Sequence, residues 1–345
     1  MTAAEIRELA RSCGFELAGV AAAEPVAELP LYREWVEAGF AGQMRYLSDR
    51  RAELRQDPRT LLPSVRSIVC VGKLYNTPRP YSTTIDDATL GWISRYAWGG
   101  DYHEVMRRGL ARLDMLLRER AGPEYESKIC VDTAPLLERS YARLAGLGWI
   151  GRNTCLIHEG GGSWFFLGEL LVSVAIEPDR PPPDRCGTCR RCIDACPTAA
   201  IVPFGAGYTV DSRLCISYCT IELRGAVPDE QRAANGGHIF GCDICQDVCP
   251  WNRRAPVTDE PAFQARSFAP PLVEMAVLTE QEFRALYAGT PVSRARYSGF
   301  LRNVAIAMGN GKLPQFREPL QKLAASDDEV VAESARWALK QIGFP

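Results

Sequence analysis

Cysteines spaced for metal binding are the strongest chemical signal in this sequence. The first run places three cysteines at intervals of three residues, and a fourth cysteine follows directly before a proline. Its members are Cys186, Cys189, Cys192 and Cys196. The second run ends in the same Cys-Pro step, and one more cysteine lies between the runs. These cysteines are Cys242, Cys245, Cys249 and, between the runs, Cys215. Such spacing lets three thiolates surround one iron–sulfur cube while the fourth cysteine reaches the other cube.

This crossing pattern predicts two [4Fe–4S] clusters on a ferredoxin-like segment between residues 184 and 255. We expect the first cluster to be ligated by Cys186, Cys189, Cys192 and Cys249. We expect the second cluster to be ligated by Cys196, Cys215, Cys242 and Cys245. Cys219 could replace Cys215, although we prefer Cys215. Two zinc sites are the structural alternative, but zinc usually takes two CxxC pairs rather than a run of four ending in Cys-Pro.

The composition narrows the remaining classes of function. A chain of 345 residues with 46% hydrophobic content fits two or three globular domains. The formal net charge of -2 gives no overall basic field for nucleic acid, although local basic patches are compatible with it. Three histidines are few for a mononuclear zinc or non-haem iron enzyme.

The ends and apolar runs of the chain predict a cytoplasmic protein with no membrane partner. Charged residues interrupt the first 20 positions, so we expect no signal peptide. No stretch reaches the ~18 uncharged apolar residues of a membrane helix, and the longest candidate, 164–176, carries Glu169. In a reducing compartment the 13 cysteines favour metal binding over disulfides. Four cysteines outside the runs are expected to be buried core thiols, namely Cys13, Cys70, Cys130 and Cys155.

Strands and helices alternate through residues 1–178, which predicts a mixed α/β (α+β) layer domain. The clearest helix covers 102–120, where apolar residues recur at helical spacing, and 67–74 is apolar enough to be a buried strand. A proline cluster at 177–184 marks a boundary. Residues 280–345 are helical and resemble stacked HEAT-type repeats, which must pack on the rest of the protein.

Gly146, Gly148 and Gly151 match the G-x-G-x-x-G pattern of dinucleotide-binding proteins. That fingerprint requires a strand before it and a helix after it. Here a helical pattern precedes the glycines and a strand-like run follows them. We therefore reject nucleotide binding and expect a tight turn, or a close backbone approach to a large flat ligand.

Several motifs taken together resemble the epoxyqueuosine reductase family. They are DPRTLLP (57–63), SRYAWGGDYH (94–103), VDTAPLLER (131–139), AGLGWIGRNT (145–154), GSWFFLGELL (162–171), CISYCTIE (215–222) and GCDICQDVCPWN (241–252). The resemblance spans about residues 1–310, and the carboxy-terminal helices match the family's HEAT-like tail more loosely. Cys219 and Arg152 depart from the family, which usually has leucine and lysine at these positions.

The resemblance implies a cobalamin-dependent enzyme that reduces epoxyqueuosine to queuosine at the wobble position of tRNA. It implies cob(I)alamin regenerated by the two [4Fe–4S] clusters. We expect a cobalamin-binding catalytic domain (1–180), a ferredoxin-like domain (181–256) and a HEAT-like helical tail (257–345). The implied partners are a tRNA anticodon stem-loop carrying epoxyqueuosine and an external electron donor such as a flavodoxin or ferredoxin. We expect the protein to be a monomer.

The resemblance also assigns Asp132 as the catalytic proton donor. A carboxylic acid can serve at neutral pH only if burial raises its pKa. The alternative is that Asp132 or Thr133 caps a helix starting at Pro135, and the two roles could coexist. The implied cobalamin contacts are Arg55, Tyr96, Asp132, Leu156, His158, Ser163 and Leu167. For His158 the alternative is an exposed turn, and for the other contacts it is ordinary packing.

Basic residues in two regions are candidates for tRNA phosphate contacts. The tail contributes Arg294, Arg296, Arg302, Lys312, Arg317 and Lys322. A second strip consists of Arg50, Arg51, Arg55 and Arg59. The alternative for both is a solvated charged face.

Two competing functions remain at the level of sequence. A reductive dehalogenase also pairs a corrinoid with two clusters, but it would be expected to carry an export leader. A ferredoxin-type electron carrier subunit would lack cobalamin and would have no large pocket in residues 1–178.

Overall fold

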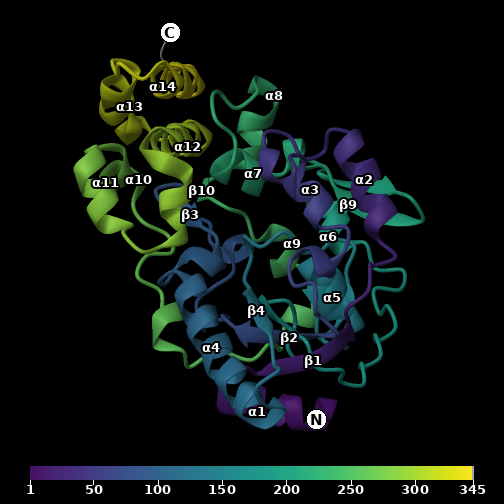
Figure 1. Cartoon of the computed structure of the whole chain (residues 1–345). Helices are drawn as coiled ribbons and strands as arrows, with labels where there is room; N and C mark the ends of the chain where they lie inside the picture. The colour runs from purple at the N-terminus through teal and green to yellow at the C-terminus, as the bar shows by residue number, and fades with distance from the viewer. Residues whose placement is uncertain (344–345) are drawn as a thin grey trace.

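A four-stranded antiparallel sheet forms the centre of the amino-terminal half of the protein (Figure 1). The computed structural model describes residues 1–343, and the end of the predicted tail segment, 344–345, lies outside this range. The strands follow the order β1 (Leu17–Ala22), β2 (Ser67–Leu74), β7 (Phe165–Val172) and β4 (Ser127–Cys130). β2 is buried along its whole length, as its continuous apolar run predicts.

Helices cover both faces of this sheet. They are α1 (Ala3–Ser12) and α4 (Tyr102–Ala121) on one face and α5 (Glu138–Leu144) on the other. Successive residues of a strand point to opposite faces, so Glu169 of β7 shares the α5 face with Leu167 and Leu171. The layers are those of the mixed α/β domain predicted from the sequence.

Short elements complete this half and the cysteine-rich segment. In the first half they are α2 (Leu29–Glu37), α3 (Arg51–Leu54), β3 (Trp92–Ile93), β5 (Trp149–Ile150) and β6 (Leu156–Ile157). In the cysteine-rich segment they are α6 (Arg191–Asp194), β8 (Ile201–Phe204), β9 (Gly207–Val210), α7 (Ile216–Ile221), α8 (Asp229–Arg232), β10 (His238–Phe240) and α9 (Ile244–Asp247). None of the helices in residues 1–343 has the length and apolar character needed to cross a membrane.

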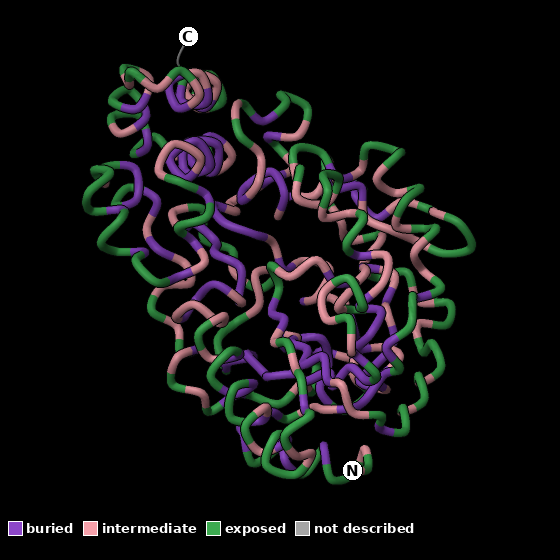
Figure 2. Tube along the Cα trace, viewed as in Figure 1, coloured by how far each residue is buried: buried purple, intermediate pink, exposed green. Residues whose placement is uncertain are grey.

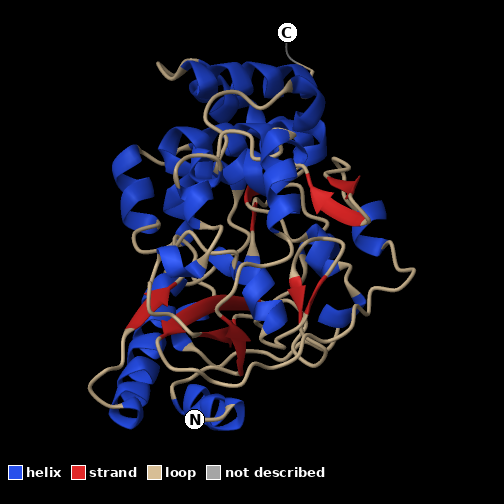
Figure 3. Cartoon of the chain, turned by 45° about the vertical axis from the view of Figure 1, so that its right-hand side comes forward, coloured by secondary structure: helices blue, strands red, loops and turns tan. Residues whose placement is uncertain are grey.

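Five helices stack at the end of the molecule opposite the sheet (Figure 3). They are α10 (Leu272–Ala276), α11 (Glu280–Leu286), α12 (Arg296–Gly311), α13 (Arg317–Ala324) and α14 (Glu329–Gln341). α12 packs against α14, and Gly309 permits the close approach, because a Cβ there would lie 2.8 Å from the Ala338 backbone. The buried face of these helices (purple in Figure 2) joins one hydrophobic cluster with Trp92 and Phe240. The tail therefore packs on the rest of the protein, as expected.

The glycine pattern at 146–151 forms a hairpin and not a phosphate-binding turn. α5 precedes it, and β5 and β6 follow as an antiparallel pair. Gly148 is required here because a Cβ would lie 2.2 Å from the carbonyl oxygen of Ile157. The rejection of nucleotide binding from the order of elements agrees with this topology.

The segment before α5 differs from the prediction. α5 begins at Glu138 and not at Pro135, and its N-cap residue, Leu137, makes no side-chain cap hydrogen bond. The preceding residues turn tightly instead, with Asp132 in the left-handed region at φ 48°. The prediction that Asp132 or Thr133 caps this helix is therefore wrong.

Candidate functional site

The eight predicted cluster ligands form two groups in space. In the first group Cys249 interacts electrostatically with Cys186 and Cys189, and Cys192 interacts with Cys186 and Cys249. The second group is formed by Cys196, Cys215, Cys242 and Cys245, which interact in the same way. The backbone thus brings Cys249 to the first run and carries Cys196 to the second group. This proximity is compatible with the exchange of ligands expected from the Cys-Pro steps, and the ligand assignment stays a prediction.

Cys219 lies near Cys215 of the second group, but its thiol has other partners. Its Sγ lies 3.2 Å from Oε1 of Gln231 and 3.8 Å from the carbonyl oxygen of Arg213. Cys13, Cys70 and Cys130 are buried core thiols, as predicted. Within residues 1–343 no three His, Cys, Asp or Glu side chains are arranged to hold a single metal ion.

A cavity of about 200 Å³ adjoins the second cysteine group. Its apolar wall comes from β6 and β7, namely Leu156, Phe165, Phe166 and Leu167. Its other lining residues are Tyr75, Tyr102, Asp132, Glu138, Arg139, Cys155, Ser163 and Gln246. Gln246 directly follows Cys245, so one end of the cavity is next to a predicted cluster ligand. Cys155, expected to be a core thiol, is only partly buried and lines this cavity.

Four of the predicted cobalamin contacts line this cavity, and three do not. Asp132, Leu156, Ser163 and Leu167 are lining residues. Arg55 is buried elsewhere, where its guanidinium donates to the carbonyl oxygen of Tyr46 at 2.9 Å. Tyr96 lies behind the wall and contacts Tyr102 edge-on, with the ring centroids 6.5 Å apart.

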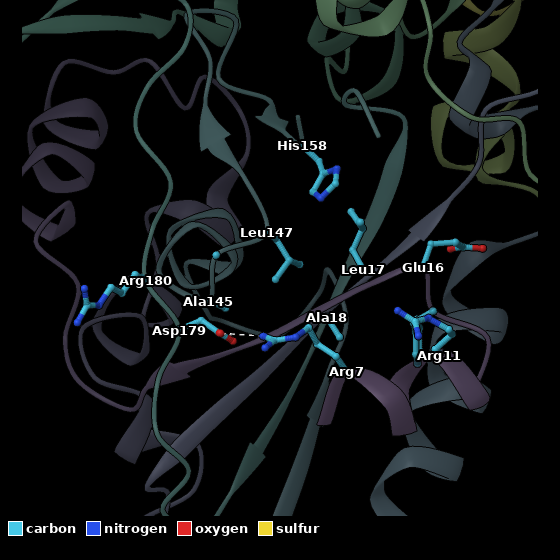
Figure 4. Close-up of a pocket in the computed structure, with 12 residues that line it drawn as sticks. Arg7, Arg11, Glu16, Leu17, Ala18, Ala145, Leu147, His158, Asp179 and Arg180 are labelled. Carbon is cyan, nitrogen blue, oxygen red and sulfur yellow. Dashed lines mark hydrogen bonds and ion pairs between the residues drawn. The ribbon is translucent and has the colours of Figure 1, made fainter. Parts of the chain in front are cut away.

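His158 faces a different cavity. That cavity has a volume of about 300 Å³ and is lined by residues of α1, β1 and the end of α5 (Figure 4). Arg7 and Asp179 form an ion pair at its edge. The loop carrying His158 is closed by a β-bridge to Gly162, and the His158 Nδ1 accepts from the Gly160 N–H at 3.1 Å.

Asp132 lies beside His103, which is the first residue that sequence reasoning missed. His103 Nε2 is 3.4 Å from Asp132 Oδ2, and His103 Nδ1 is 2.7 Å from Asp101 Oδ1. Burial would raise the pKa of Asp132, but His103, Arg294 and Tyr102 outweigh it and the pKa is lowered. The expectation of a raised pKa at Asp132 is therefore wrong. The same contact with Asp132 raises the pKa of His103, which favours the protonated imidazole beside the carboxylate.

Two more carboxyl groups lie behind Asp132. Burial, reinforced by the Asp132 charge, raises the pKa of Glu138 to about 7. Burial, reinforced by Glu138, raises the pKa of Glu169 well above its usual range. Sequence reasoning missed both groups, although Glu169 is the only charged residue in the buried strand β7. A lone carboxyl in such a strand is the signal that could have identified it.

The basic residues predicted to contact tRNA have different environments. Arg302 is 1% exposed and donates to the carbonyl oxygens of Leu223 and Gly225, so its assignment to a basic surface is wrong. Arg55 is also buried, and it cannot belong to a surface strip. Arg294 is paired with Glu222 at 2.6 Å and interacts with Asp132.

Comparisons with known proteins agree with this geometry. Residues 185–252 match a family described as "4Fe-4S double cluster binding domain", and residues 55–133 match "Epoxyqueuosine reductase QueG, DUF1730". An epoxyqueuosine reductase from Xanthomonas campestris pv. campestris is 40% identical over 99% of this chain and 96% of its own length. The epoxyqueuosine reductase of Escherichia coli K12 is 35% identical over 98% of this chain and 89% of its own length.

A solved structure gives the same result. The crystal structure of an epoxyqueuosine reductase with a tRNA-Tyr epoxyqueuosine-modified stem loop superimposes with a TM-score of 0.88. The two chains are 30% identical, and the match covers 99% of this chain and 90% of that one. Sequence relatives, cluster-domain match and fold thus agree, and the chain belongs to the epoxyqueuosine reductase family.

Proposed function

We propose that this protein reduces epoxyqueuosine to queuosine at the wobble position of tRNA. The single observation that supports this best is that one cavity is lined both by Asp132 and by Gln246, which belongs to the cysteine segment. Electrons arriving at the cysteine groups and protons held near Asp132 would meet in this one space. Reduction of an epoxide needs both the electrons and the protons.

The cysteine groups fit two [4Fe–4S] clusters, with Cys186, Cys189, Cys192 and Cys249 holding the first. Cys196, Cys215, Cys242 and Cys245 would hold the second, because Cys219 is engaged with Gln231. The lining of the cavity suits contact with part of a corrinoid, since a wall of apolar side chains faces a few polar groups. We assign Asp132, Leu156, Ser163 and Leu167 as contacts of cobalamin. When bound, these groups supply single electrons and a strongly nucleophilic cobalt.

Deoxygenation of an epoxide breaks two C–O bonds and releases the oxygen as water, which consumes two electrons and two protons. Asp132 is placed to hand a proton to the leaving oxygen. Because its own pKa is lowered, the proton is stored on His103, 3.4 Å away. Asp101 holds the imidazole of His103 in position by accepting from its other ring nitrogen. We therefore assign the His103–Asp132 pair, rather than Asp132 alone, as the first proton donor.

The RNA is proposed to cover the mouth of the cavity near Asp132. Arg294 interacts with Asp132, and Arg224, which donates to the carbonyl oxygen of Arg294, lies near Arg296. Such residues suit the phosphates of a stem-loop. We propose that the stacked helices α12 to α14 belong to a HEAT-like tail, 257–345. This tail adjoins the two other proposed domains, 1–180 and 181–256.

An external one-electron donor is proposed to dock beside the first cysteine group. Arg185, Arg190 and Arg191 are exposed in or next to the Cys186 to Cys192 run. A basic surface at this point would attract an acidic carrier such as a flavodoxin or ferredoxin. We propose that the protein acts as a monomer in the cytoplasm, where tRNA is available.

The competing functions have less support. A dehalogenase is not favoured, because relatives of nearly full length are epoxyqueuosine reductases. An electron carrier subunit is not favoured either, because the relatives of nearly full length are reductases.

The test is a turnover measurement on anaerobically reconstituted protein. The protein, loaded with iron, sulfide and cobalamin, is mixed with a low-potential reductant and an epoxyqueuosine-containing RNA stem-loop. Digestion and mass spectrometry should show a nucleoside that has lost one oxygen, and omission of cobalamin should prevent this loss. An intact epoxide in the complete mixture would overturn the proposal.

A further inference from the structure

The proposed reaction consumes two protons, but the His103–Asp132 pair holds only one. Glu138 also lines the cavity, and its carboxylate accepts a hydrogen bond from the Asp132 backbone N–H. The left-handed conformation of Asp132, φ 48°, gives the backbone at this point its unusual course. The two carboxyl groups therefore lie beside each other, and His103 acts on both of them.

Glu169 lies behind Glu138 on the α5 face of the sheet. The register places Glu169 between Cys70 of β2 and Cys130 of β4. It is 1% exposed, and within residues 1–343 its Oε1 has no hydrogen-bond partner. An unpaired carboxylate in this setting would be costly, so the neutral acid is favoured. Leu167, two residues before it on the same face, lines the cavity.

Burial and the Asp132 charge favour a Glu138 carboxyl that holds its proton, whereas the charges of Arg139 and His103 oppose it. Arg139, its neighbour in α5, donates instead to the carbonyl oxygen of Thr154 at 2.6 Å. The titratable and charged groups that face Glu138 and Glu169 are Asp132, His103, Tyr102, Arg139, Cys70, Cys130 and Lys128. Apart from His103 and Arg139, the groups that face the two carboxyls in the cavity are acidic or neutral.

From this arrangement we infer that Glu138, backed by Glu169, stores the second proton of the reaction and delivers it through Asp132. After the first proton has been used, the O–H bond of Glu138 breaks and an O–H bond forms on Asp132. Asp132 then gives this proton to the oxygen that leaves as water. The two electrons come from the external one-electron donor, and solvent at the mouth of the cavity reprotonates Glu138. The inference rests on the proposed function. In it Glu138 passes its proton to Asp132 and does not contact the substrate.

The test compares Glu138→Gln with the wild type and with Glu119→Gln, an exposed control on α4. Glutamine keeps the shape of the side chain and can accept the Asp132 N–H, but it cannot release a carboxyl proton. Single-turnover rates of reduced, cobalamin-loaded protein are measured on both sides of pH 7. The wild-type rate should fall as the pH rises, because Glu138 loses its proton. Glu138→Gln should be about 100-fold slower at the acid end and should keep only the fall that comes from deprotonation of His103.

A second readout needs neither RNA nor turnover. Infrared difference spectra of the oxidised, cluster-loaded protein should show a protonated carboxyl band that titrates near pH 7. The band should disappear in Glu138→Gln, remain in Glu119→Gln and shift in Glu169→Gln. If Glu138→Gln folds poorly, as judged by its cluster absorbance, Glu169→Gln provides both measurements.

The outcomes separate this inference from the proposed function. A wild-type pH profile in Glu138→Gln, or an unchanged carboxyl band, would overturn the proton store while leaving turnover established. A wild-type protein that leaves the epoxide intact would overturn the proposed function instead, whatever the infrared band shows.

Discussion

Asp132 combines a strained backbone with a paired side chain. Few residues other than glycine adopt φ 48°, and asparagine and aspartate tolerate it best. The tight turn aims the carboxylate at His103 and the backbone N–H at Glu138. Asp132 thus contacts both His103 and Glu138, the two groups proposed to hold the protons of the reaction.

Replacing Asp132 by Asn should abolish turnover while leaving cofactor binding intact. Asn keeps the left-handed backbone and the shape of the side chain, but it cannot transfer a proton. We expect the single-turnover rate to fall by at least about 100-fold. Bound cobalamin, measured by its visible absorption after gel filtration, should be unchanged, and exposed Asp86→Asn serves as the control. A rate within a few-fold of the wild type would exclude Asp132 as the donor.

At the scale of elements, β7 connects the cavity to the core of the sheet. Phe165 and Leu167 of this strand line the cavity, and Glu169 continues the same face inward. α5 covers this face and presents Glu138 from its first turn. Because alternate residues of a strand share a face, β7 thereby extends the lining of the cavity to a carboxyl group in the apolar layer beneath α5.

Glu169 should make the stability of the fold depend on pH. Its pKa is raised by burial in the folded protein, so the folded state binds more protons than the unfolded chain. This stabilisation is complete below the unfolded pKa and is lost as the pH rises toward the folded value. Glu169→Gln should therefore gain unfolding free energy relative to the wild type on going from acid to alkaline buffer. The gain should be about 1.4 kcal/mol for each pH unit that separates the folded pKa from the unfolded one. Denaturant titrations at several pH values test this, and a constant difference would contradict it.

The α12–α14 contact offers a matched pair of glycine substitutions. A Cβ at Gly309 would lie 2.7 to 2.8 Å from Trp337 and Ala338, so Gly309→Ala should destabilise the tail by about 1–3 kcal/mol. Gly299 belongs to the same helix, but its nearest neighbour would be 4.0 Å away. Gly299→Ala should therefore stabilise the protein by about 0.5–1 kcal/mol. Thermal unfolding followed by circular dichroism measures both, and equal shifts would contradict the packing argument.

The sequence predicted local patterns well and missed features made by distant contacts. The bounds of β2 and α4 and the order of elements around Gly148 followed from hydrophobic spacing and turn residues. The start of α5 did not, because the turn at Asp132 depends on partners from other parts of the chain. The grouping of His103, Glu138 and Glu169 was invisible for the same reason, since α4, α5 and β7 meet only in the folded protein. Arg302 was misplaced because a charged residue normally marks a surface, whereas here backbone carbonyls surround it.

At the scale of the whole molecule, the amino-terminal half, the cysteine segment and the helical tail pack against one another through common hydrophobic clusters. The tail helices pack against Trp92 and Phe240, and Cys249 packs with Trp149 and Ile157. The cysteine segment is thus held between the sheet and the tail. Gln246, next to Cys245 of the second cysteine group, lines the cavity.

Iron content should distinguish the roles of Cys215 and Cys219. The wild type should bind about eight iron atoms per chain after anaerobic reconstitution. Cys215→Ser should lose iron from the second cluster, whereas Cys219→Ser, four residues further along the chain, should retain the full amount. The reverse pattern would move the ligand to Cys219, and about four iron atoms in the wild type would remove one cluster.

The central claim is that the cysteine groups deliver electrons to a cofactor in the cavity beside Asp132. Electron paramagnetic resonance of the anaerobic, cobalamin-loaded protein during stepwise reduction tests it most directly. We predict signals of two reduced [4Fe–4S] clusters together with a cobalt(II) signal that disappears as reducing equivalents are added through the clusters. A cobalt signal identical to that of free cobalamin, or one that persists when both clusters are reduced, would contradict the account.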